Sequence, residues 1–392
     1  MSTPSTPPTP STLSTLSTLS TLFRNGVVHS VDNPFATAVL VTGGTVAWLG
    51  NEAGADAFGT GARVVDLDGA LLTPAFADAV VDAGQDAGDL LARAAGLGVA
   101  ALHVHRSAPR ELATLAALTA GQDAPLAVPF LLRFLSGVDD AVTLTRADPG
   151  LAGIVAVDAQ TPEEVRDHVL ALHAAGCAGG VRAEDEESLE IAIGGFQLAA
   201  GSVGEDAIRS RGYRLEVGAQ LRGLGPEAPS HLRAGVDRHR LTVVAHAGGP
   251  SEEPVWADLD LAGLVRTGVP LALGSGGGQM RDPWRTIAAA IEHPLEAARL
   301  TALAAFAAHT RGVWRAGPVH PAGPQGRIAI GSAATLAVWR TGALLVQTPD
   351  EHAASSSTDP RAGIPALPAL GAGERLPRCL LTMRDGHILY QA

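Results

Sequence analysis

The chain has 392 residues, of which 46% are hydrophobic and 17% are charged, and its net charge is −12. That is enough apolar material for a large folded core, which excludes a disordered chain. Nucleic acids and anionic membranes select clustered basic surface, so the acidic balance excludes both as expected partners. The sequence contains no lysine, which removes lysine carbamates and Schiff bases from its available chemistry.

Residues 1–22, MSTPSTPPTPSTLSTLSTLSTL, form a Ser/Thr/Pro segment that ends in four S-T-L triplets. This segment lacks the basic start and unbroken apolar stretch of a secretory signal, so we expect a disordered tail. The two cysteines, Cys177 and Cys379, are far apart in the sequence and lie in no metal-binding spacing. They fit a reducing cytoplasm, which is the location that we expect for this protein.

Short strands are predicted at both ends of the remaining chain. Near the start, FRNGVVHSV, TAVLVTGGTVAWLG and RVVDLDGALLTP alternate apolar and polar residues around Asn25-Gly26 and Gly43-Gly44, which predicts an antiparallel meander. The same alternation of apolar and polar residues returns near the end of the chain, in GRIAIGSAATLAVWR and CLLTMRDGHILYQA. We therefore expect one small β-sandwich-like domain assembled from residues 23–72 and 326–392.

The middle of the chain, residues 73–325, alternates helix-like and strand-like stretches. DLLARAAGLG, PRELATLAALTAG and TPEEVRDHVLALHAAG are predicted helices, the last with Thr161 as cap and Pro162 in its first turn. Nearly continuous apolar strands between helices predict a parallel β/α architecture, and about 250 residues is the usual size of a (β/α)8 barrel. Six strands can be placed, whereas residues 183–237 are ambiguous, so the barrel is either complete or imperfect.

The layout and several stretches resemble the amidohydrolase superfamily. FRNGVVHSVDNPFATAVLVTGGTVAWLG followed by VVDLDGALLTPAFADAVVDAG is similar to the opening of the amidohydrolase-3 branch, which includes N-substituted formamide deformylases. GVPLALGSGGGQMRDPWRTIAAAI is similar to the branch's last barrel strand, and the closing segments are similar as well. The resemblance implies hydrolysis of non-peptide C–N bonds by water activated on a divalent metal ion.

The resemblance also locates gaps in the implied metal site. The family's opening ends in F-x-D-x-H-x-H, but Val80 and Asp82 stand where the two histidines belong. Gly276 stands where the family has an aspartate, and the absence of lysine excludes a bridging carbamate. His246, in RHRLTVVAHA, is the clearest remaining ligand candidate, and with Asp82 it is the candidate catalytic pair.

A relocated site is one interpretation of the remaining histidines. His103 and His105 end the stretch ALHVH, and residues two apart on a strand face the same side. With His246 and Asp82 they would form a site for one divalent ion, zinc, iron or manganese. The competing interpretation is that these are hydrogen-bonded histidines at strand ends and that no metal binds. His168 and His173, on the helix after Thr161, are expected to face solvent or a neighbouring helix.

Two functional classes follow from these observations. The first is an altered hydrolase that acts on carbon–nitrogen bonds and takes a small-molecule substrate at the barrel mouth. The second is a catalytically inactive pseudoenzyme that serves as a binding or regulatory scaffold. A homo-oligomer is compatible with both classes.

Overall fold

The computed structural model describes the following residues: 20–58, 61–82, 87–105, 125–133, 154–158, 160–217, 224–225, 230–247, 256, 258–276, 280–318, 325–346, 364–371 and 373–392. Side chains are described for all of these except residues 82, 87, 105, 126–133 and 154–155. The expected tail and the helix predicted for PRELATLAALTAG lie outside the described residues, apart from residues 20–22.

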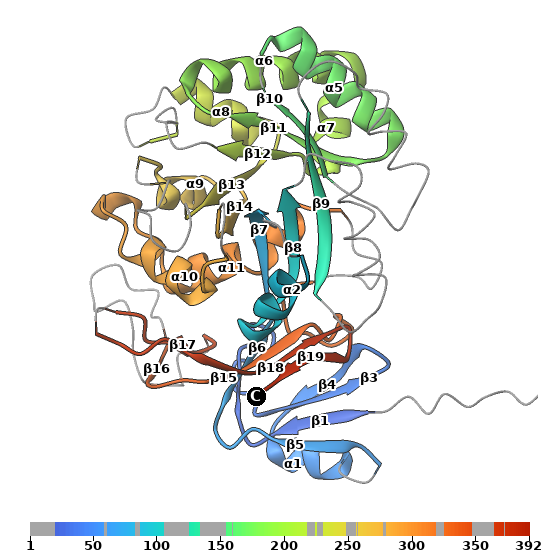
Figure 1. Ribbon diagram of the computed structural model, residues 1–392, viewed down its shortest axis with the longest axis vertical. Helices are drawn as coiled ribbons and strands as arrows, with labels where there is room; N and C mark the ends of the chain where they lie inside the picture. Colours follow the sequence, from blue (N-terminus) through green and yellow to red (C-terminus); the bar gives the residue numbers. More distant parts are fainter. Residues whose placement is uncertain are drawn as a thin grey trace, which may run out of the picture.

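Eight parallel strands form one sheet in the centre of the molecule (Figure 1). Their order is sequential, β14-β13-β12-β11-β10-β9-β8-β7. Their bounds are β7 Phe76–Asp82, β8 Val99–His105, β9 Leu126–Arg133, β10 Ile154–Asp158, β11 Ala178–Ala183, β12 Arg214–Val217, β13 Thr242–His246 and β14 Leu271–Gly274.

Two of these strands were missed by the sequence prediction. The stretch AGGVRA of β11 carries two glycines, and RLEV of β12 carries two charges, so neither has the apolar run that marks a buried strand. Gly180 has a packing reason, because a Cβ there would lie 2.4 Å from the Arg214 backbone oxygen. Close approach of neighbouring backbones is a recognised use of glycine within strands.

The central sheet is strongly curved. Arg214, on β12, bonds to atoms of β7 and β8, although four strand spacings of about 4.8 Å would separate β12 from β8 in a flat sheet. The two outermost strands also meet, since Gly276 N, just past β14, donates a 2.9 Å hydrogen bond to Val80 O on β7. The first and last strands of the order are therefore neighbours in space.

Helices follow most of the central strands. Their bounds are α2 Ala87–Gly96, α5 Pro162–Ala175, α6 Glu186–Val203, α7 Glu205–Arg211, α8 Ser230–Arg238, α9 Leu261–Arg266, α10 Pro283–Ile291, η3 Glu296–Ala298, α11 Ala302–Ala308 and α12 Arg311–Arg315. Thr161 caps α5, as the sequence predicts, and Asp185 caps α6 and Asp282 caps α10. No helix within the described residues is both long and apolar enough to traverse a membrane.

Strands from both ends of the chain form two further sheets, here called the terminal sheets. The first has the order β4-β3-β1-β5 and the second the order β19-β18-β15-β6-β2. Their bounds are β1 Thr21–Arg24, β2 Val27–Val28, β3 Ala38–Thr42, β4 Thr45–Gly50, β5 Arg63–Asp66, β6 Leu71–Pro74, β15 Leu336–Arg340, β18 Arg378–Arg384 and β19 His387–Gln391. A short pair, β16 Leu344–Leu345 and β17 Leu367–Pro368, and helices α1 Glu52–Ala55 and η1 Asp56–Phe58 complete the described elements.

The predicted meander is only partly correct. The hairpins β3–β4 and β18–β19 are antiparallel, with Gly43-Gly44 and Asp385-Gly386 at their turns in left-handed conformation. However, β5 pairs in parallel with β1, and β6 pairs in parallel with β2. The alternation of apolar and polar residues indicates strands but not the strands with which they pair. At β2 and again at β6 the chain passes from the first terminal sheet to the second, where a meander would have paired each strand with the next.

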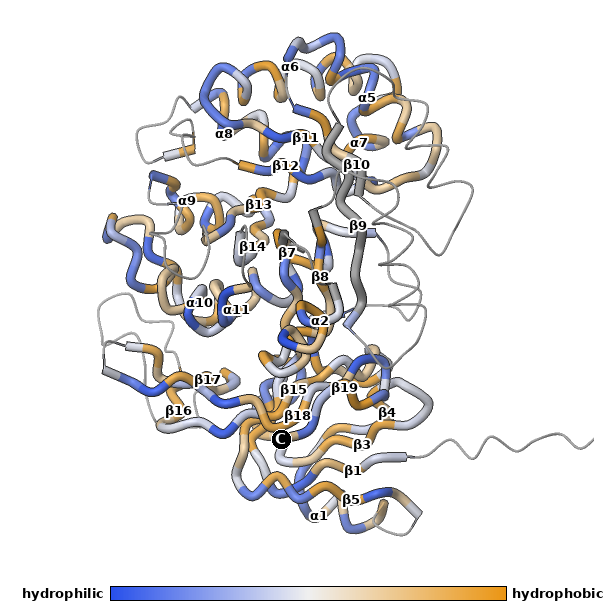
Figure 2. Tube along the Cα trace, viewed as in Figure 1, coloured by the Kyte–Doolittle hydropathy of each residue, from blue (hydrophilic) through white to orange (hydrophobic). Residues whose placement is uncertain are grey.

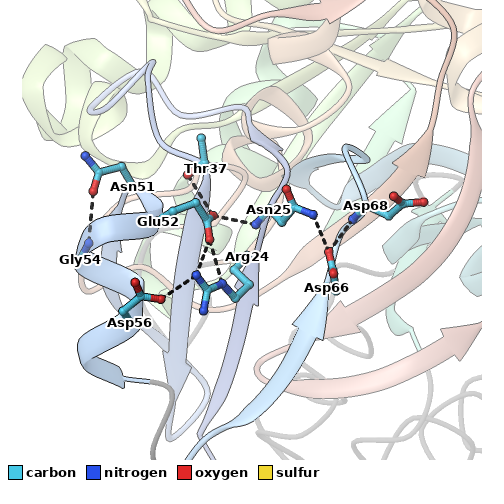
Figure 3. A network of polar contacts seen from close by, with 9 residues as sticks. All are labelled: Arg24, Asn25, Thr37, Asn51, Glu52, Gly54, Asp56, Asp66 and Asp68. Atoms are coloured by element: carbon cyan, nitrogen blue, oxygen red, sulfur yellow. Dashed lines mark hydrogen bonds and ion pairs between the residues drawn. The ribbon is translucent and has the colours of Figure 1, made fainter.

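A single carboxylate fastens one end of the first terminal sheet (Figure 3). Glu52 Oε1 accepts hydrogen bonds from Asn25 N at 2.7 Å and Thr37 Oγ1 at 3.1 Å. Its Oε2 accepts from Arg24 Nε at 2.8 Å, and Arg24 Nη2 also reaches Asp56 Oδ1 at 2.8 Å. The end of β1 is thereby held to α1. Hydrophobic residues run along β1 and β3 (Figure 2). Phe23 of β1 and Val39 and Val41 of β3 belong to a hydrophobic core separate from the larger core around the central sheet.

Candidate functional site

Asp82, His105 and His246 are the last residues of β7, β8 and β13. Asp82 pairs in register with His105, and His246 pairs with Gly274, the last residue of β14. Carboxyl ends of parallel strands meet at one end of a sheet, so these three positions share the carboxyl end of the central sheet. The side chains of Asp82 and His105 lie outside the described residues, and their convergence with half-buried His246 stays a prediction.

His103 lies lower on β8 and is engaged elsewhere. Its side chain is 2% exposed, and its Nδ1 is 3.0 Å from Nη1 of Arg214. Because a guanidinium only donates hydrogen bonds, Nδ1 accepts, and the proton of the neutral ring is then on Nε2. A Cβ at Gly317 would be 2.7 Å from Nε2, so the chain also lies close against that nitrogen.

Arg214 is the centre of a buried polar network. Its side chain is fully buried, donates from Nη2 to Ala79 O at 3.0 Å, and forms an ion pair with Glu216 on the same strand. Burial lowers the pKa of Arg214, and the charge of Glu216 opposes that effect. Since an arginine stays protonated in proteins, the network places a permanent cation beside His103.

The position of the first expected histidine is part of an apolar cluster. Val80 is 7% exposed and packs with alanines of β7 and β8, with Val244 of β13 and with Val313 of α12. Its backbone N donates to Asp78 Oδ1 at 3.1 Å, and Ser275 N donates to the same oxygen at 2.9 Å. The strand end therefore holds a hydrocarbon side chain where the resemblance implies an imidazole.

Asp78 joins the first and last strands through these bonds. Its Oδ2 also accepts a hydrogen bond from Ser275 Oγ, so the carboxylate is held by three donors. Burial raises the pKa of Asp78, while the nearby His309 ring and the Ser275 hydrogen bonds oppose the rise. We assign Asp78 to holding β7 against β14, because its oxygens are taken by the backbone and Ser275.

Two positions of the expected metal site, Val80 and His103, are unsuited to binding a metal ion. A ligand nitrogen needs a free lone pair, and His103 gives its Nδ1 lone pair to Arg214. The Val80 side chain has no atom that can bind a metal, and the cationic Arg214 donates a hydrogen bond to the carbonyl of the preceding residue, Ala79. Among the residues whose side chains are described, no three His, Cys, Asp or Glu gather as a metal site.

A polar cavity of about 380 Å³ lies at the carboxyl ends of β10 and β11. Arg182 Nε bonds to Asp158 Oδ1 at 2.8 Å and lies 3.0 Å from Glu184 Oε1. The acidic stretch that follows begins α6, with Asp185 accepting a hydrogen bond from Ser188 N. This cavity therefore lies at the same end of the central sheet as Asp82, His105 and His246.

Sequence reasoning missed Arg214 and Glu216, although a signal was present. In GYRLEV they stand two residues apart on a strand otherwise apolar, so both point to the same face. Charges at that spacing in a buried strand predict a paired interior network.

The sequence prediction for His168 was wrong, because that side chain is 2% exposed and its Nε2 lies 3.2 Å from Gly180 O on β11.

No protein-family model matches the sequence, and no curated protein is significantly similar to it. Solved structures do resemble the fold. A crystal structure of an amidohydrolase superposes with a TM-score of 0.61 at 14% identity, covering 95% of this chain and 99% of the other. A prolidase complexed with N-methylphosphonate-L-proline gives 0.63 at 14% identity, covering 95% and 100%. A zinc-bound adenosine deaminase from Xanthomonas campestris gives 0.62 at 14% identity, covering 94% and 92%.

These neighbours are members of the amidohydrolase superfamily, and the chain has their fold over nearly its whole length. At this level of identity the similarity establishes the fold alone, because one fold hosts many functions.

Proposed function

We propose that this chain is a divergent amidohydrolase of the amidohydrolase-3 branch, similar to N-substituted formamide deformylases, that has lost its inherited metal-dependent C–N hydrolysis. In its place the protein serves as a binding or regulatory scaffold, with a small-molecule ligand at the mouth of the barrel. The observation that carries this proposal is the hydrogen bond from Arg214 to His103 Nδ1, which removes a ligand nitrogen and supplies a cation.

The same proposal includes the architecture. The sequential eight-strand order, its curvature and the Gly276–Val80 hydrogen bond support a closed (β/α)8 barrel over residues 73–325. The pairing of β6 with β15 supports a small composite β domain from residues 23–72 and 326–392. A cytoplasmic location and a homo-oligomer belong to the proposal as well.

A second candidate function is hydrolysis at an altered, mononuclear site. The observation that favours it is the strand register, which brings the backbones of Asp82 and His105 side by side at the strand ends. In that candidate Asp82, His105 and His246 would hold one zinc, iron or manganese ion and supply the carboxylate that accepts a proton from water.

Metal content separates the two candidates. Protein purified without chelators is incubated with excess zinc, iron(II) or manganese, desalted and assayed by elemental analysis. If the metal centre has been lost, the wild-type protein should hold much less than one ion per chain, and the His246→Ala variant should hold the same amount. About one ion per chain that is lost in His246→Ala and Asp82→Ala, but kept in the exposed control His231→Ala, would establish the altered site. Hydrolysis of small formamides by the metal-loaded protein would then be the matching activity.

A further inference from the structure

A cavity of about 340 Å³ lies between β6 of the second terminal sheet and helices α11 and α12. Helix α12 supplies Arg311 to its wall and packs against the start of β14, where a Cβ at Gly312 would be 2.0 Å from Leu271 O. The cavity is therefore at the opposite end of the central strands from Asp82 and His246. Its volume is within the range of small-molecule sites. It is therefore separate from the candidate metal centre.

The walls of this cavity are apolar. Pro74 of β6, Leu303 and Phe306 of α11, and Ile328 contribute them, and Val31 adds an exposed side chain at the edge. Concave apolar walls with a few placed polar groups are the usual composition of a ligand site.

Two arginines form a positive rim. Arg311 and Arg327 line the cavity and are exposed, and the left-handed Gly326 (φ 74°) brings their chain segments together. A Cβ at Gly326 would be 2.6 Å from the Arg311 Cα, so the two backbones touch. Within the described part of the chain neither arginine makes an ion pair, and Asp32 is the one acidic residue among the lining side chains.

A buried imidazole supplies the remaining polar group. His29 is 5% exposed, packs on Phe306 with ring centroids 4.8 Å apart, and its Nδ1 lies 3.0 Å from Ala366 O. A carbonyl only accepts, so Nδ1 carries the proton and Nε2 of the neutral ring presents a lone pair. The described residues make no hydrogen bond to Nε2, which leaves it available to a ligand donor.

We propose that this cavity binds a small organic acid with an apolar body and a hydroxyl group. The carboxylate pairs with Arg311 and Arg327 at the rim, and the hydroxyl donates to His29 Nε2. Charge-assisted hydrogen bonds between arginine and carboxylate are strong and directional, so the arginines give the site its preference for anions. The proposal does not depend on whether the metal centre is lost or altered.

Calorimetric titration with 4-hydroxybenzoate and its 2- and 3-hydroxy isomers tests the proposal on the full chain. We expect saturable 1:1 binding of at least one isomer, weaker binding of benzoate, which lacks the hydroxyl, and weaker binding of the uncharged hydroxybenzamide. In the Arg311→Gln/Arg327→Gln variant the affinity should fall at least tenfold, and it should be unchanged in the exposed control Arg63→Gln.

Filling the cavity gives an independent readout. Leu303→Trp places a large ring in the cavity and should abolish binding, with thermal unfolding showing that the variant is folded. The proposal is overturned if no isomer binds the wild-type protein, if the double arginine variant binds as tightly as Arg63→Gln, or if the folded Leu303→Trp variant retains full affinity.

Discussion

The indole of Trp339 fills the space that a side chain at Gly98 would take: a Cβ on Gly98 would lie 2.2 Å from the ring carbon Cη2. Trp339 is on β15, and Gly98 directly precedes β8, so this contact joins a terminal sheet to the central sheet. The indole N–H donates to Thr73 Oγ1 at 2.9 Å, and the ring meets Phe76 and Trp284 edge-on.

Gly98→Ala should therefore destabilise the protein more than the same substitution at a left-handed glycine with open space around it. The left-handed φ of 73° costs about 1–2 kcal/mol for an L-residue, and overpacking against Trp339 adds about 1–3 kcal/mol. Gly268→Ala is the matched control, because Gly268 has φ 84° with no heavy atom within 4 Å of its Cβ position. Urea denaturation of both variants gives the comparison, and equal losses would show that the ring yields.

Arg214→Met should be strongly destabilising, by about 3–5 kcal/mol, because it leaves Glu216 buried without its cation. Glu216→Leu should cost a similar amount, whereas the double variant should cost much less than the sum. The surface pair Arg209–Glu205, at 3.7 Å, is the control, and Arg209→Met should cost less than about 1 kcal/mol. A loss below that value for Arg214→Met would mean that the network is not a structural centre.

The stability of the protein should fall in mild acid through His29. Burial lowers the pKa of His29 to about 4 from the ordinary 6.5. In the unfolded chain the ring takes up a proton below about pH 6.5, whereas in the folded protein it does so only near pH 4. The stabilisation is thus complete above pH 6.5 and is lost as the pH falls towards 4, by up to about 3 kcal/mol.

The measurement is the difference in unfolding free energy between wild type and His29→Gln at several pH values from 4 to 7.5. Glutamine cannot take up the proton, so the difference should change with pH across this window. A difference that stays constant would show that His29 titrates normally in the folded state.

Cys379 should be inert towards thiol reagents while the protein is folded. The residue is 5% exposed, and burial raises its pKa to about 11, against a smaller opposing effect of its hydrogen bond to Thr382. The thiolate is the reactive form, so little of it exists at pH 8. In a Cys177→Ser variant, Ellman's reagent should react slowly with the native protein and fast in guanidinium, and similar rates in both would contradict the prediction.

Local chemistry made part of this fold predictable. Thr161 with Pro162, and Asp282 with Pro283, mark helix starts through groups within a few residues of each other, and both helices begin where the sequence indicates. The turns at Gly43-Gly44 and Asp385-Gly386 depend on backbone conformations that few residues adopt. Such signals are read without knowing where the rest of the chain lies.

The candidate site was less predictable because it depends on contacts between distant strands. The apolar stretch that ends in ALHVH correctly predicts a strand, but no local pattern shows that Arg214, 111 positions later, hydrogen-bonds to His103. In the same way, β5 pairs in parallel with β1, and no pattern in the turn before β5 indicates that partner. That Val80 and Gly276 offer no side-chain ligand atom can be read from the sequence, whereas the cation beside His103 cannot.

The position of β6 between β2 and β15 has a consequence for how the protein is made. At about 5–20 residues per second, the ribosome needs roughly 10–50 s after β6 to deliver β15. During that interval the fully buried stretch Leu71–Pro74 has one open edge, which is a template for pairing with other nascent chains. The pairing of β15 with β6 thus covers an edge that stays exposed while the central part of the chain is synthesised. We expect nascent chains to be most prone to aggregation until β15 has been synthesised.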